Sequence, residues 1–203
     1  MSEAIRQESP LVERITSGRK AASPSDAGIT LRERPFLGCV NLRGNPDDPD
    51  FTDAVKGVLG LALPSGPNTV ADSGDITAFW LAPTEWFVRT GANAERDLIA
   101  GLEEALAGQH IATNDVTGNF TTVELSGPHA RDVLEKGCTL DLHPRAFAPG
   151  QCAQTLLGHA GILIRPLADG QAFEIVVRRS FADYMFIWLE DATVEYGGMA
   201  VSD

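Results

Sequence analysis

The stretch Thr121-Thr122-Val123-Glu124-Leu125-Ser126-Gly127-Pro128 indicates how the second half of the chain folds. Its first five residues alternate in polarity and include β-branched side chains, which is typical of a strand with one buried face. Pro128 then opens a run of helical spacing, and proline is favoured in the first turn of a helix because that turn needs no N–H donor. We therefore predict a strand that turns directly into a helix at Gly127.

The first half of the chain repeats this plan. Val40-x-Leu42-x-Gly44 matches Val123-x-Leu125-x-Gly127, so that corresponding residues differ by 83 in number. The helices that begin near Asn93 and Ser180 correspond with a difference of 87. Two such units can pack around a shared sheet. The predicted fold is α+β, with duplicated β-α-β-β-α units around a curved, partly barrel-like antiparallel sheet.

The chain divides into four segments by composition and pattern. Residues 1–30 are polar and show no sustained period, so we expect a flexible N-terminal arm. The first β-α half should span residues 31–110 and the second half residues 111–197, followed by a C-terminal tail at 198–203. A chain of 203 residues is long enough to bury a substantial core.

The chain is acidic and has few cysteines. Its formal net charge of −12 argues against nucleic acid and membrane surfaces as partners, because both attract basic patches. Three cysteines without a C-x-x-C pair are typical of free thiols in a reducing compartment. The N-terminus shows no basic leader, and no apolar run approaches the roughly 20 residues that span a membrane. A cytoplasmic location is expected.

Residues 115–128 carry a family resemblance. A D-V-S-type turn at Asp115-Val116-Thr117, a strand, and S-G-P at a helix start resemble the folate-binding aminomethyltransferase family, which includes the T-protein of glycine cleavage. The resemblance implies a folate-binding aminomethyltransferase-like fold.

Further motifs resemble the gamma-subunit family of heterotetrameric sarcosine oxidase, over about residues 36–197. This resemblance implies a complex that oxidatively demethylates sarcosine to glycine, with tetrahydrofolate as one-carbon acceptor and hydrogen peroxide as product. The motifs are Gly137-Cys138-Thr139-Leu140-Asp141-Leu142-His143-Pro144-Arg145, Cys152-Ala153-Gln154-Thr155-Leu156-Leu157, Arg178-Arg179-Ser180-Phe181-Ala182-Asp183-Tyr184 and Trp188-Leu189-Glu190-Asp191-Ala192.

The same resemblance implies how the work of such a complex is divided. FAD, FMN, NAD and tetrahydrofolate would be held by other subunits, and this chain would bind no cofactor alone. Its partners would be larger alpha and beta subunits and a small zinc-binding delta subunit. This chain would have a structural, assembly or channel-shaping role, without a catalytic residue and without activity in isolation.

Asp141 is the candidate for a contact with folate. It falls where the resembled aminomethyltransferases carry an aspartate that engages the folate amine, although Thr139-Leu140-Asp141 lacks their neighbouring asparagine. The segment Gly161–Arg165 also lacks their acidic pair, which would leave pterin donors unpaired. An alternative function is a folate-binding aminomethyltransferase-like protein that acts through Asp141. The other interpretation is that Asp141 caps a turn.

Cys138 and His143 suggest a thiol nucleophile with a base. A reactive thiol needs a nearby base or cation, and no third orienting residue is evident. Zinc ligation by Cys138, His143 and Cys152 matches no familiar ligand spacing. We expect a half-buried structural cysteine at position 138 and no metal site.

Five residues are candidates for an interface with a larger subunit. Guanidinium groups favour bidentate pairing with carboxylates, so arginines in an acidic chain can dock acidic groups of a partner. The competing interpretation is pairing inside the chain, with Asp132, Asp141 or Glu174. The tryptophan candidate follows a turn, where a hot-spot aromatic can be exposed. The candidates are Trp86, His143, Arg145, Arg178 and Arg179.

Overall fold

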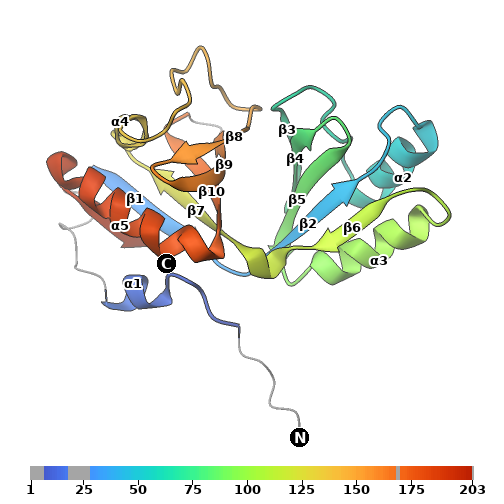
Figure 1. The fold of residues 1–203 in the computed structure, drawn as a ribbon, viewed down its shortest axis with the longest axis horizontal. Coiled ribbons are helices and arrows are strands. Elements are labelled where there is room, and N and C mark those ends of the chain that lie inside the picture. The colour runs from blue at the N-terminus through green and yellow to red at the C-terminus, as the bar shows by residue number, and fades with distance from the viewer. Residues whose placement is uncertain (1–6, 18–27, 168–169, 203) are drawn as a thin grey trace, which may run out of the picture.

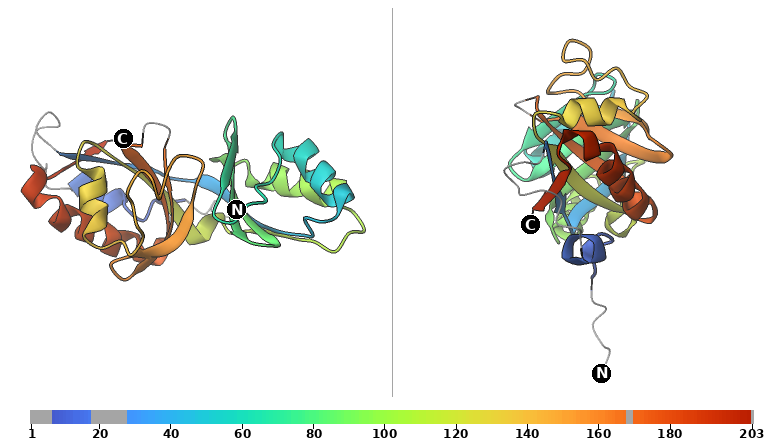
Figure 2. Two further views of the ribbon diagram at one scale, coloured as in Figure 1. Left: turned by 90° about the horizontal axis from the view of Figure 1, so that it is seen from above. Right: turned by 90° about the vertical axis from the view of Figure 1, so that its left-hand side faces the viewer.

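The computed structural model describes residues 7–17, 28–167 and 170–202 as two lobes that lie side by side (Figures 1 and 2). The N-terminal lobe is an antiparallel sheet covered by α2 (Pro49–Leu59) and α3 (Glu95–Ala105). Its strands lie in the order β3 (Val70–Ser73), β4 (Ile76–Ala82), β5 (Glu85–Ala92), β2 (Leu37–Arg43) and β6 (Ala112–Asp115).

The C-terminal lobe is a six-stranded sheet with α1 (Val12–Ser17), α4 (Ala130–Glu135) and α5 (Ala182–Ala192). Only β11 and β1 pair in parallel among its described strands. None of the helices in the described ranges combines the length and apolar character needed to cross a bilayer. The strands lie in the order β11 (Met199–Ser202), β1 (Ile29–Arg34), β7 (Phe120–Ser126), β10 (Ala172–Arg178), β9 (Ala160–Pro166) and β8 (Ala153–Leu157).

The two lobes share one topology. The sequence β2-α2-β3-β4-β5-α3-β6 in the first lobe corresponds to β7-α4-β8-β9-β10-α5-β11 in the second. The strand orders also correspond, except that β1 is inserted between β7 and β11. The predicted α+β class and its duplicated plan are therefore confirmed. Each unit has its own open sheet, so the single barrel-like sheet is replaced by two sheets that meet.

The boundaries of the lobes differ from the predicted halves at three strands. β1 belongs to the C-terminal lobe, where it pairs with β7 on one side and β11 on the other. β6, beyond residue 110, pairs with β2 of the N-terminal lobe. Residues 199–202, expected as a tail, form β11. Each of these strands belongs to the lobe whose strands pair with its backbone N–H and C=O groups. Because those partner strands are distant in the sequence, local sequence does not reveal which lobe a strand joins.

Part of the expected arm packs against the C-terminal lobe. Leu11 is fully buried in the core of this lobe, and the hydroxyl of Ser9 donates to Glu33 on β1. On α1, Arg14 donates to both carboxylate oxygens of Asp183 on α5, with an Nη2–Oδ2 distance of 3.0 Å. Residues 1–6 and 18–27 of the expected arm lie outside the described residues.

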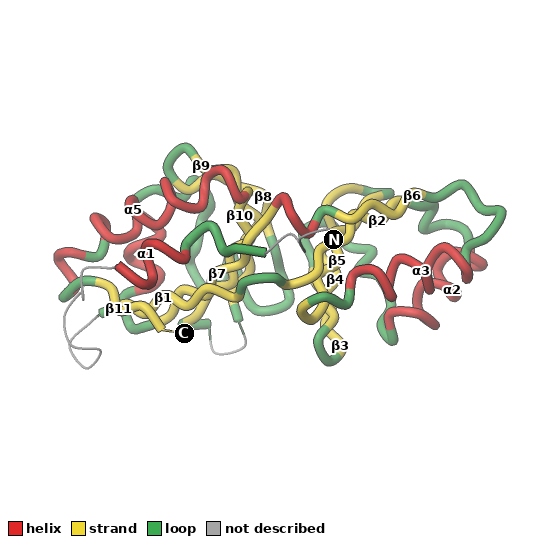
Figure 3. The backbone as a smooth tube through the Cα atoms, turned by 90° about the horizontal axis from the view of Figure 1, so that it is seen from below, coloured by secondary structure: helices red, strands yellow, loops and turns green. Residues whose placement is uncertain are grey.

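The alternation of side chains on the strands gives each sheet one face toward its own helices and one toward the other lobe. On β5, Trp86 and Val88 pack in the core beneath α2 and α3, whereas Phe87 packs in a cluster between the sheets. Figure 3 shows α1 and α5 on one side of the molecule and α2 and α3 on the other. The inter-sheet cluster consists of Cys39, Phe79, Phe87, Cys152, Leu163 and Val176.

Gly127, in the turn between β7 and α4, is expected to tolerate no side chain. Its φ is +125°, and a Cβ would lie 2.6 Å from the carbonyl oxygen of Gly28. Gly127→Ala should lower the free energy of unfolding by more than about 1 kcal/mol, as measured by urea denaturation. Gly57→Ala on α2, where a Cβ meets nothing within 4 Å, should raise it by up to about 1 kcal/mol. Equal effects of the two changes would contradict this account of the turn.

Candidate functional site

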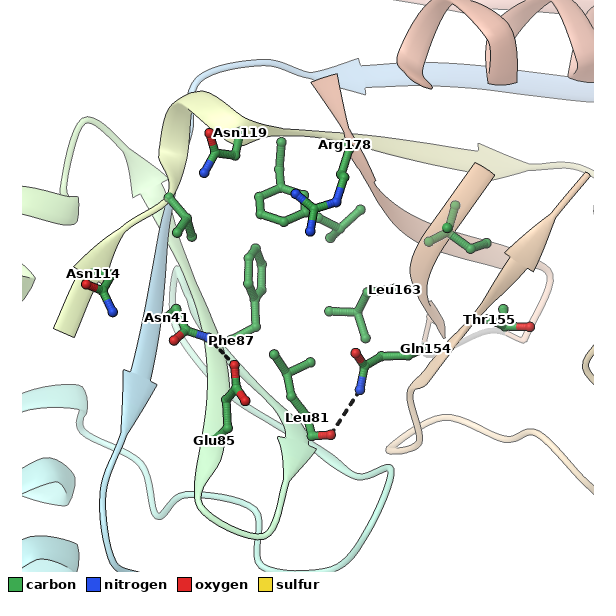
Figure 4. Close-up of a pocket in the computed structure, with 15 residues that line it drawn as sticks. Asn41, Leu81, Glu85, Phe87, Asn114, Asn119, Gln154, Thr155, Leu163 and Arg178 are labelled. Carbon is green, nitrogen blue, oxygen red and sulfur yellow. Dashed lines mark hydrogen bonds between the residues drawn. The ribbon is translucent and has the colours of Figure 1, made fainter. Parts of the chain in front are cut away.

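A hollow lies at the junction of the two lobes (Figure 4). This junction cavity has a volume of about 700 Å³, within the range typical of ligand pockets. Apolar side chains from both sheets form much of its lining, and amide side chains and one arginine project from its edges. The lining residues used below are Asn41, Glu85, Phe87, Asn114, Asn119, Phe120, Leu163, Val176 and Arg178.

Most charge at the cavity edge is already paired, with one exception. Glu85 accepts from Asn41 Nδ2 at 2.8 Å and from Arg43 Nη2 at 2.7 Å, so both of its carboxylate oxygens are engaged. Arg178, at the end of β10, places its guanidinium carbon 5.5 Å from the centroid of the Phe120 ring. Among the described residues, the side chain of Arg178 makes no interaction other than this cation–π contact. No described carboxylate accepts a hydrogen bond from it. Arg178 is therefore available to an anionic group.

A buried ionic network joins the lobes beside the cavity. Glu174 on β10 lies 3.2 Å from Arg89 Nε of β5 and accepts from Arg165 Nη2 at 3.2 Å. Arg165 on β9 also donates to both carboxylate oxygens of Asp72 on β3, at 2.7 and 2.8 Å. Thr77 accepts from Arg89 Nη2 at 2.6 Å. The two arginines and Glu174 are each less than 9% exposed, so their pairing is required rather than incidental.

This network was not predicted from the sequence, although the hydrophobic pattern of the strands contains a signal for it. Arg89, Arg165 and Glu174 each interrupt the apolar run of a strand, where a charge must be buried if both faces of the sheet are covered. The sequence could not show that the three charges come from strands of different lobes and meet. The network fixes β5 relative to β9 and β10, and hence the shape of the junction cavity.

Asp141 lies on the exposed loop between α4 and β8. Its Oδ1 accepts from the backbone N–H of His143 at 3.0 Å, so the turn-capping interpretation is confirmed. Asp141 is not among the described residues that line the junction cavity. A pterin held by a carboxylate would need a walled pocket around it, and an exposed turn with one oxygen engaged fits that group poorly.

The structure separates the five interface candidates. His143 and Arg145 are exposed on the loop after α4, where Arg145 N–H donates to His143 Nδ1 at 3.2 Å. Arg178 and Arg179 are exposed at the end of β10 and the start of the 3₁₀ turn η2 (Arg179–Phe181). Their proposed internal partners are otherwise engaged, because Glu174 binds Arg89 and Arg165, and Asp132 contacts His129.

Trp86 is corrected from an interface residue to a core residue. It is 1% exposed, and its ring centroid lies 5.9 Å from that of Phe51 on α2. Its Nε1 donates to the carbonyl oxygen of Pro64 at 2.8 Å. The residue follows a turn, but the strand alternation directs its side chain beneath the helices and leaves no surface for a partner.

The three cysteines are free thiols in the structure. Burial raises the pKa of Cys39 to about 12 and that of Cys152 to about 11, so their reactive thiolate forms are scarce at neutral pH. Cys138 is half-buried, as expected. Within the described ranges no group of three or more His, Cys, Asp or Glu side chains could hold a metal ion.

The burial of Cys39 and Cys152, which raises their pKa values, predicts an order of alkylation. In the folded chain at pH 8, iodoacetamide should label Cys138 first and leave Cys39 and Cys152 unmodified until urea unfolds the protein. Peptide mass spectrometry at successive times measures the three sites separately. Early labelling of Cys39 would contradict the burial of that thiol.

Comparison with solved structures identifies the class of protein. A chain of heterotetrameric sarcosine oxidase from Corynebacterium sp. U-96, solved in complex with pyrrole 2-carboxylate, superimposes with a TM-score of 0.85 and 28% identity, over 97% of this chain and 99% of that one. The glycine cleavage system aminomethyltransferase T from Bartonella henselae gives a TM-score of 0.65 at 15% identity, over 95% of this chain and 58% of that one. The second likeness shows a shared fold. The two lobes thus have the aminomethyltransferase-like fold.

Sequence relatives identify the family of this chain. The profile of the sarcosine oxidase gamma subunit family matches residues 43–195. The sarcosine oxidase gamma subunits of Corynebacterium sp. strain P-1 and of an Arthrobacter species are 36% and 33% identical to this chain, each over 89% of it and 88% of the relative. The chain belongs to the sarcosine oxidase gamma subunit family. Its activity is therefore that of one subunit in an oxidoreductase complex.

Proposed function

We propose that this chain is the non-flavin gamma subunit of a complex that demethylates sarcosine to glycine, transfers the one-carbon unit to tetrahydrofolate and releases hydrogen peroxide. Its own role is structural: it assembles the complex or shapes a channel within it. The observation that carries this role is the junction cavity, whose walls come from both lobes and whose edge presents Arg178 without a carboxylate partner among the described residues. We assign no catalytic residue to this chain.

We assign the cofactors to the partners. FAD, FMN and NAD would be bound by the larger alpha and beta subunits, and zinc by the small delta subunit. This assignment is supported by the lack of a strand-linked G-x-G-x-x-G motif in this sequence. A cytoplasmic location agrees with three cysteines that remain free thiols.

Affinity purification tests the proposal. The chain, tagged and expressed in its native host with sarcosine as nitrogen source, should recover larger chains, flavin absorbance and sarcosine-dependent peroxide. The tagged chain purified alone from a host without these partners should be colourless and without that activity. Recovery of a colourless chain alone from the native host would overturn the proposal. Titration with tetrahydrofolate, with Asp141→Asn as the comparison, would then test the alternative function.

A further inference from the structure

The junction cavity adjoins a second hollow across the end of β10. This second hollow, of about 460 Å³, shares Asn119 and Arg178 with the cavity. We call the two adjoining hollows together the arginine groove. The second hollow is open and is lined by Pro10, Gly118, Asn119, Arg178, Arg179 and Ser180.

The arginine groove is positively charged although the chain carries a net charge of −12. Arg178 and Arg179 stand next to each other in the sequence at its centre, and no described carboxylate accepts a hydrogen bond from either of them. Glu85, the acidic residue of the groove, is neutralised by Arg43. Two exposed guanidinium groups without a carboxylate partner among the described residues have a strong preference for carboxylates.

Amide side chains beside the arginines add the hydrogen-bonding pattern of a peptide. Asn114 and Asn119 line the cavity, and neither side chain has a hydrogen bond to another described residue. Each carboxamide offers a donor and an acceptor, which matches the N–H and C=O of an extended backbone. Below them, Phe87, Leu163 and Val176 form an apolar floor that can receive one side chain.

We propose that the arginine groove binds an extended acidic segment of a partner subunit, with a carboxylate on Arg178 and an apolar side chain in the junction cavity. This inference rests on the proposed function, because it requires an assembled complex. The extent of the site over two adjoining hollows favours a polypeptide over a small carboxylic acid. The segment should end or reverse beyond Arg179, because the carboxylates in the lining of the next hollow, Glu8, Glu95 and Asp115, outnumber its cations Arg96 and Arg179.

Cross-linking within the assembled complex tests the occupant. Asn119→Cys, in a Cys138→Ser background, is labelled with a thiol-reactive benzophenone, since burial keeps Cys39 and Cys152 unreactive. After assembly and irradiation, mass spectrometry should find a cross-link to an acidic stretch of a larger subunit. Lys56→Cys, on the exposed face of α2, is the matched control and should give no such product. Cross-linking of Asn119→Cys to a non-acidic segment, or only within this chain, would overturn the inference.

Charge reversal supplies the second measurement. Arg178→Glu should weaken association with the partner subunits by about tenfold or more, because it opposes like charges across the interface. Lys56→Glu makes the same change in net charge on α2 and should leave association unchanged. The loss for Arg178→Glu should shrink at high salt as the repulsion is screened. Unchanged association of Arg178→Glu would overturn the groove, whereas failure of the unmodified chain to find partners would overturn the proposed function itself.

Discussion

Glu174→Gln should lower the free energy of unfolding by about 3–5 kcal/mol, the range expected when one partner of a buried ion pair is removed. Arg165 retains Asp72 as its partner after this change. Arg89 keeps no carboxylate partner after this change, because Glu174 is the one that pairs with it among the described residues. The side chain of Arg89 is 7% exposed, so water does not replace the lost partner. The loss therefore arises from a stranded cation between the lobes. Urea denaturation followed by far-ultraviolet circular dichroism measures it.

A double-mutant cycle separates this cause from a general packing defect. Arg89→Met in the Glu174→Gln background removes the stranded charge and should recover part of the lost stability. Glu135→Gln on α4, an exposed position, should change the free energy of unfolding by less than about 0.5 kcal/mol. Additive losses for the two changes in the network would show that the charges do not act on each other.

Trp86→Ala should cost about 3–5 kcal/mol of unfolding free energy, as large-to-small changes at buried aromatic positions do. The change leaves a cavity beside Phe51 and removes the donor to the carbonyl oxygen of Pro64. Urea denaturation of the isolated chain measures the loss. If Trp86 were instead an interface residue, its truncation would weaken association with partners and leave the isolated chain as stable as before.

Trp86→Phe is the conservative comparison. It keeps an aromatic ring against Phe51 and removes the hydrogen bond from Nε1. The expected loss is about 1–3 kcal/mol, the cost of one buried acceptor left without its donor. A loss equal to that of Trp86→Ala would show that the hydrogen bond outweighs the packing at this position.

The local turns show where sequence reasoning reaches its limit. Ser180 and Asp183 suggest a capping box, yet α5 begins at Ala182 after a 3₁₀ turn and has no side-chain cap. Asp183 is engaged instead by Arg14, 169 residues away in sequence. A side chain that could cap a helix locally can thus pair instead with a residue that is distant in the sequence. Asp141 is the opposite case, because its partner is two residues away and the predicted turn cap is found.

Local sequence determined the α+β class, the repeated unit and the family, because strand alternation, helical spacing and motifs such as Ser126-Gly127-Pro128 act over a few residues. Only the tertiary structure decided that β1 joins the second lobe and that Trp86 is buried. It also decided that Arg89 and Glu174, 85 residues apart, meet between the lobes. The physical reason is that alternation divides a strand into two faces without specifying what covers either one. That choice is made by the docking of one lobe on the other, which buries the charges and leaves Arg178 open to a partner.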